Sequence, residues 1–176
     1  MEMLKNIQIE SQRIKLVPLT KKYRTEIFRE FSYEITQYMF PKSPESIEET
    51  DLFISKCVKD LEKGTDLIMA IVDIQTGDYL GNVGIHKIGT SIPELGIWVK
   101  KSAHGNGYGK EAVQLIKLWA DKNIKYQYIT YPVDINNTPS RKIPESMDGV
   151  VVREYDKRSQ SGNVLHLVEY RIPSGN

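Results

Sequence analysis

The segment HGNGYGKEAV, residues 104–113, carries three glycines at every second position and leads directly into residues with helical spacing. A strand-like run, IPELGIWV (92–99), precedes it. The first N–H groups of a helix have no partners within the helix, and the helix dipole adds positive potential there. Glycines keep side chains away from those donors. The segment therefore predicts a site for the phosphate groups of a ligand, with a glycine turn that holds no ligand as the alternative.

The glycine spacing argues against two common nucleotide motifs. A dinucleotide fingerprint needs G-x-G-x-x-G near the first strand, whereas Gly105, Gly107 and Gly109 give G-x-G-x-G after several strands. A nucleotide P-loop needs Ser or Thr after its Gly-Lys pair, but Glu111 follows Lys110 here. An unrelated phosphate-binding α/β protein stays open as an interpretation.

The rest of the chain alternates between strand and helix patterns. Strands are predicted at 13–19, 67–73, 79–88, 92–99, 126–134, 149–156 and 164–172. Helices are predicted after Thr20, from Ser43 to Gly64, over 110–123 and over 137–146. Ser43 and Thr138 are the expected N-caps of the second and last helices. This order predicts a single mixed α/β domain over residues 1–176, with about seven strands and about four helices.

Composition narrows the class of protein. The 176 residues carry 24 Lys and Arg against 23 Asp and Glu, a net charge of +1, which predicts no nucleic-acid partner. We find no run of about 18 apolar residues and no signal-peptide core, so we expect no membrane partner and a cytoplasmic location. His86, His104 and His166 are scattered, which predicts no metal site. Cys57 lies among apolar residues and is interpreted as a buried thiol, with a nucleophile as the alternative.

Three segments resemble a known family. PELGIWVKKSAHGNGYGKEAV (93–113) resembles the central motif of the GNAT superfamily of N-acetyltransferases, Gln/Arg-x-x-Gly-x-Gly/Ala. Gly107 and Gly109 match its small positions, while His104 stands where the motif has Gln or Arg. SQRIKLVPLT (11–20) and NNTPSRKIPE (136–145) resemble the branch that acetylates ribosomal-protein N-termini, polyamines and some antibiotics. The resemblance covers roughly residues 10–152 and implies a mostly antiparallel sheet, splayed between the fourth and fifth strands.

The resemblance implies acetyl-CoA as cosubstrate, with its pantetheine arm between 92–99 and 126–134. That arm would pair with backbone groups of Ile97, Trp98 and Val99. The pyrophosphate would lie on the N–H groups of His104, Gly105, Asn106, Gly107, Tyr108, Gly109 and Lys110. Lys110 or Arg141 would meet the remaining phosphate charge. Asn137 and Ser140 would contact the pantetheine. A solvated His104 and an Asn137 that serves a turn alone are the alternatives.

The implied reaction is direct attack of an amine on the thioester in a ternary complex. Glu94, at the start of the fourth strand, is the candidate that accepts the amine's proton, directly or through water, and a surface glutamate is the alternative. A backbone N–H near residues 97–99 would stabilise the charge on the thioester oxygen. Many relatives carry a tyrosine acid where this chain has Pro144, so water or another tyrosine, such as Tyr131, would serve the thiolate.

The acceptor amine is the least determined part of this interpretation. In the family the first two helices and their connection form much of the acceptor site, which points to Glu34, Tyr38 and Phe40. A protein N-terminus, a polyamine and another small-molecule amine all stay open. A coenzyme A sensor or scaffold without turnover is the rival function. The last strand is apolar enough for its edge to pair with a second copy, which predicts a homodimer.

Overall fold

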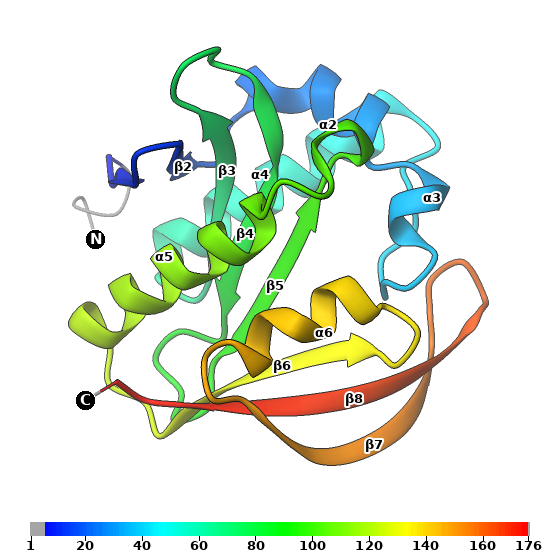
Figure 1. Ribbon diagram of the computed structural model, residues 1–176. Helices are drawn as coiled ribbons and strands as arrows, with labels where there is room; N and C mark the ends of the chain where they lie inside the picture. The colour runs from blue at the N-terminus through cyan, green and yellow to red at the C-terminus, as the bar shows by residue number, and fades with distance from the viewer. Residues whose placement is uncertain (1–5, 176) are drawn as a thin grey trace.

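The structure, a computed structural model, describes residues 6–175, and within them a mixed sheet runs in the order β1-β2-β3-β4-β5-β6-β8-β7 (Figure 1). Neighbouring strands are antiparallel except β5 and β6, which are parallel. The strands are β1 (Ile9–Glu10), β2 (Ile14–Pro18), β3 (Leu67–Asp73), β4 (Tyr79–His86), β5 (Glu94–Val99), β6 (Tyr128–Asp134), β7 (Val150–Arg158) and β8 (Val164–Pro173).

Helices cover both faces of this sheet. They are α2 (Arg24–Glu30), α3 (Tyr33–Thr36), α4 (Ile47–Lys63), α5 (Tyr108–Asn123) and α6 (Thr138–Glu145), with 3-10 turns η1 (Lys21–Tyr23) and η2 (Lys101–Ala103). Figure 1 shows α5 and α6 on the near side of the sheet and α4 behind it. Within residues 6–175 no helix has the length and apolar character needed to cross a membrane.

The sheet separates two apolar cores. Side chains of α5 pack with Leu95 of β5 in one core, whereas α2 and α4 pack with Trp98 of β5 in the other. Successive side chains of a strand point to opposite faces, so β5 contributes to both cores. Residues 94, 96 and 98 therefore face the α2–α4 side, and residues 95, 97 and 99 face the α5 side.

The predicted elements are confirmed as a mixed α/β sheet, with small differences in count. The structure adds the two-residue strand β1 and the short helix α3, which are not among the predicted strands and helices. The described residues thus contain eight strands and five α-helices rather than about seven and about four. Both additions are too short to show a periodic pattern in the sequence.

Two predicted helix caps are wrong by one to three residues. Helix α4 begins after Ser46 rather than Ser43, because the Ser46 Oγ accepts a hydrogen bond from the Glu49 N–H at 3.4 Å. Helix α6 is capped by Asn137 rather than Thr138, and the Asn137 side chain accepts from the Ser140 N–H at 3.4 Å. In both cases the cap is the polar residue whose oxygen reaches the N3 N–H.

The expected free edge of the last strand is also wrong. Strand β8 lies between β6 and β7, and it pairs with each of them over at least seven residues. The edge at this end of the sheet is β7, which returns through a hairpin to cover β8. Sequence pattern alone could not reveal this order because both strands of a hairpin carry apolar residues. A homodimer stays a prediction, but it no longer rests on an exposed β8.

Candidate active site

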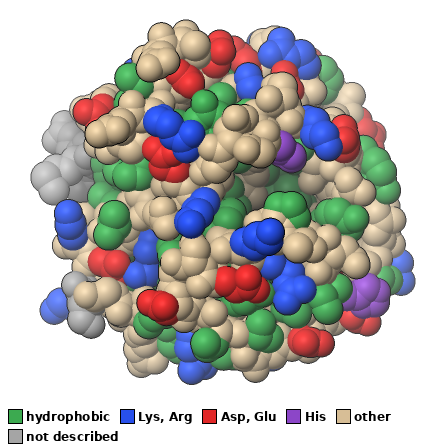
Figure 2. Space-filling view, in the orientation of Figure 1, with side chains coloured by type: hydrophobic (Ala, Val, Ile, Leu, Met, Phe, Trp, Pro, Cys, Tyr) green, Lys and Arg blue, Asp and Glu red, His purple; other side chains and the backbone are tan. Residues whose placement is uncertain are grey.

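A cleft forms where β5 and β6 part. Among the described residues, the two strands are paired through Glu94 and Thr130 alone, and the remaining residues of each strand diverge. A cavity of about 1440 Å³ lies along this divergence, lined by residues of β4, β5, β6, the α2–α4 region and the β7–β8 hairpin. Figure 2 shows the surface hollowed on this side, with basic side chains around the hollow. The splay predicted between the fourth and fifth strands of the sequence pattern is confirmed.

The glycine-rich turn lies between β5 and α5 and depends on left-handed backbone. Gly105 and Gly107 have φ of 79° and 77°, values that side chains disfavour, and Gly107 is the N-cap of α5. The Glu111 N–H donates to the Gly107 carbonyl at 3.1 Å, which is the first bond of the helical ladder. The N–H groups of 108–110 precede that ladder and are the donors that an anion would meet.

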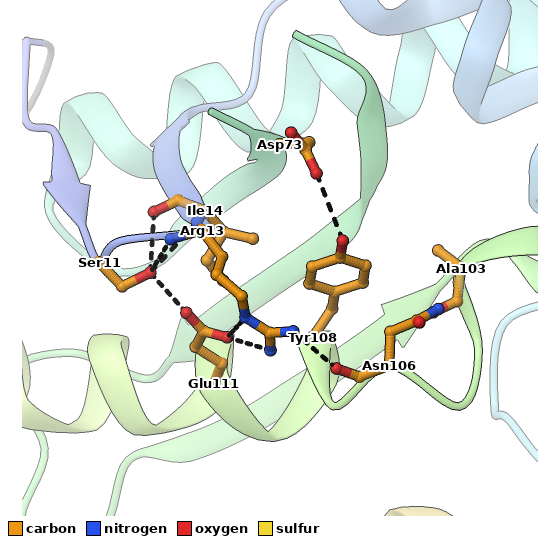
Figure 3. Close-up of polar contacts among 8 residues, drawn as sticks. All are labelled: Ser11, Arg13, Ile14, Asp73, Ala103, Asn106, Tyr108 and Glu111. Carbon is orange, nitrogen blue, oxygen red and sulfur yellow. Dashed lines mark hydrogen bonds and ion pairs between the residues drawn. The ribbon is translucent and has the colours of Figure 1, made fainter. Parts of the chain in front are cut away.

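A clamp from the turn between β1 and β2 holds the glycine turn in place (Figure 3). Arg13 forms an ion pair with Glu111 on the first turn of α5, and its Nη1 donates to the Asn106 carbonyl at 3.0 Å. The Arg13 guanidinium also lies over the Tyr108 ring, 4.8 Å from its centroid. Ser11 Oγ donates to the other Glu111 oxygen at 2.5 Å. The hydrogen bond with Glu111 raises the pKa of Arg13, so the clamp stays charged.

Sequence reasoning missed this clamp because its members are far apart in the chain. Arg13 and Glu111 are 98 residues apart, the first in the turn before β2 and the second on α5. Tyr108 adds a second link, since its hydroxyl donates to Asp73 Oδ2 at the end of β3 at 3.3 Å. Backbone N–H donors at the turn that follows, with Thr76 the strongest, lower the pKa of Asp73 and keep it an acceptor. The glycine turn is therefore fastened to two strands of the sheet.

The predicted cofactor-binding residues fall into two groups. Ile97, Trp98, Asn137 and Ser140 line the cavity. Val99, Arg141 and the turn residues 104–110 lie outside its lining. His104 is turned toward the strand, with Nε2 2.6 Å from the Val99 carbonyl oxygen.

Arg141 and Asn137 have partners within the fold. Arg141 Nε donates to the Tyr170 hydroxyl at 3.1 Å, and its Nη1 to the Ile135 carbonyl at 3.3 Å. Asn137 is the N-cap of α6 and also lines the cavity, so a structural role and a binding role occur together.

A tyrosine and a serine meet on the α6 side of the cavity. The Tyr131 hydroxyl lies 2.7 Å from Ser140 Oγ, and both residues line the cavity. Tyr131 is 2% exposed, and burial raises its pKa, which keeps the hydroxyl protonated. Pro144 follows one turn later inside α6, where relatives were expected to carry a tyrosine. The neighbourhood of Ser140 therefore holds a phenol, but it comes from β6.

Paired residues of β4 and β5 form the α2–α4 side of the cleft. Three pairs face each other across the two strands: Asn82 with Trp98, Gly84 with Gly96, and His86 with Glu94. All six residues line the cavity. Outside these strands, Lys87 Nζ donates to Glu94 Oε2 at 2.7 Å.

A histidine–carboxylate contact lies at the same end of the strands. His86 Nδ1 is 2.7 Å from Asp66 Oδ1, which comes from the turn before β3. In the sequence, His86 is one of three scattered histidines, and its spacing gives no sign of this contact.

Two buried polar atoms in the cavity lining lack hydrogen-bond partners among residues 6–175. They are Thr50 Oγ1 on α4 and Asn82 Nδ2 on β4, in residues that are 2% and 4% exposed. The other end of the Asn82 side chain accepts from the Tyr79 hydroxyl at 2.8 Å. Leaving a buried donor unsatisfied costs about 1–3 kcal/mol, so a ligand that supplies an acceptor there gains affinity.

The predicted acceptor residues are only partly brought together. Tyr38 and Phe40 line the cavity, whereas Glu34 lies outside its lining and forms an ion pair with Lys101 at 2.7 Å. This contact lowers the pKa of Glu34. Lys157 Nζ lies 4.0 Å from the centroid of the Phe40 ring, which adds positive charge on this side of the cavity.

Cys57 lies outside the lining of the cleft. Cys57 is 7% exposed on α4, and burial raises its pKa to about 12, which supports the structural interpretation. Within the described part of the chain, no three His, Cys, Asp or Glu side chains are grouped closely enough to hold a metal ion.

Comparison with known proteins gives a family match and several similar folds. The family described as acetyltransferase (GNAT) domain matches residues 13–150. RimL, a ribosomal L7/L12 alpha-N-protein acetyltransferase in complex with coenzyme A, is 14% identical with a TM-score of 0.84, over 97% of this chain and 100% of that one. A GNAT-family acetyltransferase from Bacillus anthracis is 18% identical with a TM-score of 0.81, over 97% and 100%.

A third similar structure carries both coenzyme A and an amine. It is spermidine N-acetyltransferase from Vibrio cholerae in complex with CoA and spermine, which is 15% identical with a TM-score of 0.80. The match covers 93% of this chain and 97% of that one. At these identities the likeness establishes the shared fold.

Proposed function

The chain belongs to the GNAT acetyltransferase family, and we propose that it transfers an acetyl group from acetyl-CoA to a primary amine. One observation carries the proposal: a parted pair of parallel strands meets a glycine-rich helix start. The divergence of β5 and β6 beyond Glu94 and Thr130 frees backbone groups of β5 for an extended ligand arm. The start of α5 after Gly107 supplies donors for phosphate groups at the end of the same strand.

The residues at the glycine turn fit a pyrophosphate. Left-handed φ at Gly105 and Gly107 directs backbone N–H groups outward without a Cβ in the way. Gly109 packs against β5, since a Cβ placed there would lie 3.5 Å from Val99 Cγ2. We propose that residues 104–110 hold the pyrophosphate, and that Ile97, Trp98 and Val99 offer backbone groups to the pantetheine arm. Lys110 or Arg141 is the proposed partner of the remaining phosphate charge.

The cosubstrate would supply a thioester carbonyl, and the chain would supply a place for the amine beside it. Glu94, the candidate base from the sequence, lines the cavity with a side chain that is 32% exposed. Its Oε2 already accepts a hydrogen bond from Lys87, which leaves Oε1 for an ammonium group. A backbone N–H of residues 97–99 would donate to the carbonyl oxygen as charge develops on it.

The leaving thiolate would meet the Tyr131–Ser140 pair from the other side of the cleft. The buried Tyr131 hydroxyl keeps its proton, so it can donate a hydrogen bond to sulfur either directly or through Ser140. A coenzyme A thiol resembles cysteine, with a pKa of about 8.5, so the thiolate needs a hydrogen bond more than a strong acid. This pair is our proposed substitute for the tyrosine expected at residue 144.

For the acceptor, we propose a peptide-like amine rather than a polyamine. Two acids of the segment between α2 and α4 are already engaged, since Lys101 pairs with Glu34 and Lys42 pairs with Glu45. A polyamine brings several cations and N–H donors, which these paired acids would not attract strongly. The α-amino end of a peptide carries a carbonyl oxygen beside its nitrogen, and such an oxygen would satisfy Asn82 Nδ2.

The first test is ligand-dependent thermal stability. The thermal midpoint is measured with acetyl-CoA, free coenzyme A, ATP and NAD. A ligand present at about 100 times its dissociation constant adds about 2.7 kcal/mol to the free energy of unfolding. We expect a rise with the two coenzyme A species, and a rise with ATP or NAD alone would refute the proposal.

Turnover is tested next by thiol release from acetyl-CoA with a panel of peptides, spermidine and small amines. Peptides with a free N-terminus are expected to react fastest. Binding of acetyl-CoA without release in any of these reactions would favour the coenzyme A sensor instead.

A further inference from the structure

We propose that His86 is the group that accepts the proton of the acceptor amine, and that Asp66 positions its ring. This inference rests on the proposed acetyl transfer and assigns a residue that the sequence analysis did not single out. It gives Glu94 a different part, that of attracting the ammonium group and holding Lys87.

The contact with Asp66 fixes which imidazole nitrogen can act as a base. His86 Nδ1 lies 2.7 Å from Asp66 Oδ1, and an ionised carboxylate can only accept a hydrogen bond. Nδ1 therefore carries the hydrogen, and the lone pair of the neutral ring lies on Nε2. Within residues 6–175, Nε2 has no hydrogen-bond partner, and the side chain is 40% exposed toward the cavity.

The His86 ring lies over a part of β4 and β5 where the facing residues are glycines. Gly84 and Gly96 are paired across β4 and β5, on the same side of the sheet as His86. A Cβ placed on Gly96 would lie 3.5 Å from His86 Nε2, and one placed on Gly84 would lie 3.6 Å from it. Nε2 is thus held next to the backbone that precedes Ile97, where the strands part and where the thioester is proposed to lie.

Glu94 is less available for the same task. Its Oε2 is 2.7 Å from the Lys87 ammonium, so a proton taken up there would have to displace this ion pair. His86 and Glu94 are directly paired across the strands, which places both near one amine. In this arrangement the Glu94 carboxylate attracts the ammonium group. The free Nε2 of His86 accepts the proton.

The charged and titratable surroundings of this pair come from five segments of the chain. Asp66 contacts the ring, and Glu94 on β5 and Lys87 after β4 lie beside it. Helix α4 brings Lys56 and Cys57 within electrostatic range of Asp66, and β7 brings Tyr155 within range of Glu94 and Lys87. Among these side-chain types, imidazole is the one that most often serves as a general base in enzymes.

The proton and electron balance is simple. An ammonium proton passes to Nε2, and the freed nitrogen lone pair forms the C–N bond to the acetyl carbon. The C–S bond breaks, and sulfur leaves with its electron pair. The second proton lost from nitrogen neutralises the thiolate, so the products are an amide and a thiol. His86 then returns its proton to water, which regenerates the neutral ring.

The test uses bromoacetyl-CoA on the full chain, because this reagent does not require a known acceptor. A neutral imidazole within reach of the acetyl position displaces bromide, and mass spectrometry of peptides locates the new C–N bond. We expect the adduct on His86, slowed by free coenzyme A, with a rate that rises between pH 5 and 8. H86Q should lose the adduct while keeping the thermal shift with coenzyme A.

Three further variants separate the roles. D66N should slow labelling of His86 about tenfold and alter its pH dependence, with D66E restoring part of the rate. E94Q should be labelled at His86. H166Q is the matched control, because His166 also contacts an aspartate, Asp156, at 2.7 Å but lies outside the lining of this cavity.

Each outcome bears on a different claim. An adduct on another residue, or unchanged labelling in H86Q, would overturn the assignment of His86 while leaving acetyl transfer intact. Loss of the thermal shift with coenzyme A in the unaltered protein would overturn the proposed function and this inference together. With an active acceptor in hand, H86Q should lower kcat/KM by about 10²- to 10⁴-fold and remove the acidic limb of the pH profile.

Discussion

The glycine turn at the start of α5 and the α2–α4 side of the cleft are built differently, although β5 connects them. The turn is defined by backbone conformation and is fastened by Arg13, Glu111 and Asn106. The α2–α4 side is defined by side chains and keeps Thr50 and Asn82 with unsatisfied polar atoms. A backbone site suits a ligand part that never changes, such as a pyrophosphate. A side-chain site with open donors suits a part that differs between substrates.

Beneath the α2–α4 side of the cleft lies a packed apolar core that contains Cys57. The reactivity of this thiol should show the largest of the expected effects. Burial raises the pKa of this thiol from 9.0 to about 12, so at pH 8 its thiolate fraction should fall by about 10³-fold. Alkylation by iodoacetamide should be correspondingly slow in the folded protein and fast in guanidinium. Fast alkylation in the folded protein would show that solvent and reagent reach the core beneath the cleft.

The same thiol gives a pH dependence of stability. Because the folded pKa lies above the unfolded value, the contribution of Cys57 is complete below pH 9 and is lost as the pH rises toward 12. Burial likewise raises the pKa of Tyr79 and Tyr131, so their contributions also disappear at alkaline pH. The free energy of unfolding should therefore fall above pH 9, with a smaller slope in C57A, as measured by denaturant titration at a series of pH values.

Gly107 tests the backbone character of the turn. G107V puts a β-branched side chain at φ of 77° and in the path of the N–H groups of α5. Losing one or two charge-assisted hydrogen bonds corresponds to about 2.7 kcal/mol, or about 100-fold in coenzyme A affinity by calorimetry. G162V is the matched control, since Gly162 has φ of 90° in the β7–β8 turn. It should lose stability but keep its affinity, and equal affinity losses would contradict a local role of Gly107.

The contrast between the two regions also explains what the sequence could predict. The glycine turn, the strands on either side of it and the helix it begins are contiguous, so local spacing was sufficient to place them. The parting of β5 from β6 followed from the family resemblance. The exact N-cap of a helix depends on which side-chain oxygen reaches a backbone N–H. Residues 43 and 46 are both serine, so the sequence does not distinguish them as caps of α4.

The contacts that complete the site could not be read from the sequence. Asp66 and His86 meet because a hairpin brings the start of β3 beside the end of β4, and their separation of 20 residues has no periodic meaning. The spacing of His86 relative to the other histidines therefore speaks only to metal ligation, and it gives no sign of the contact with Asp66. Tyr131 reaches Ser140 across the β6–α6 turn, which explains how a chain with Pro144 still has a phenol at this place.

The smallest expected effect concerns the clamp that joins the turn to β2. The Arg13 side chain is 49% exposed, so solvent screens its ion pair with Glu111 and limits the coupling energy to about 0.5–1 kcal/mol. A double-mutant cycle of R13A and E111Q, followed by denaturant unfolding, should return a value in this range. R13A should also weaken coenzyme A binding about threefold, because Asn106 loses a donor that holds the turn.

R29A is the control for this cycle, since Arg29 pairs with Glu30 on α2 and has no contact with the turn. It should leave coenzyme A affinity unchanged. If R13A also left affinity unchanged, the turn would hold its shape through Gly105 and Gly107 alone, and the clamp would serve stability. A loss of coenzyme A affinity much larger than threefold would mean that Arg13 itself contacts a phosphate group. The phosphate site would then depend on a side chain, as the acceptor side of the cleft does.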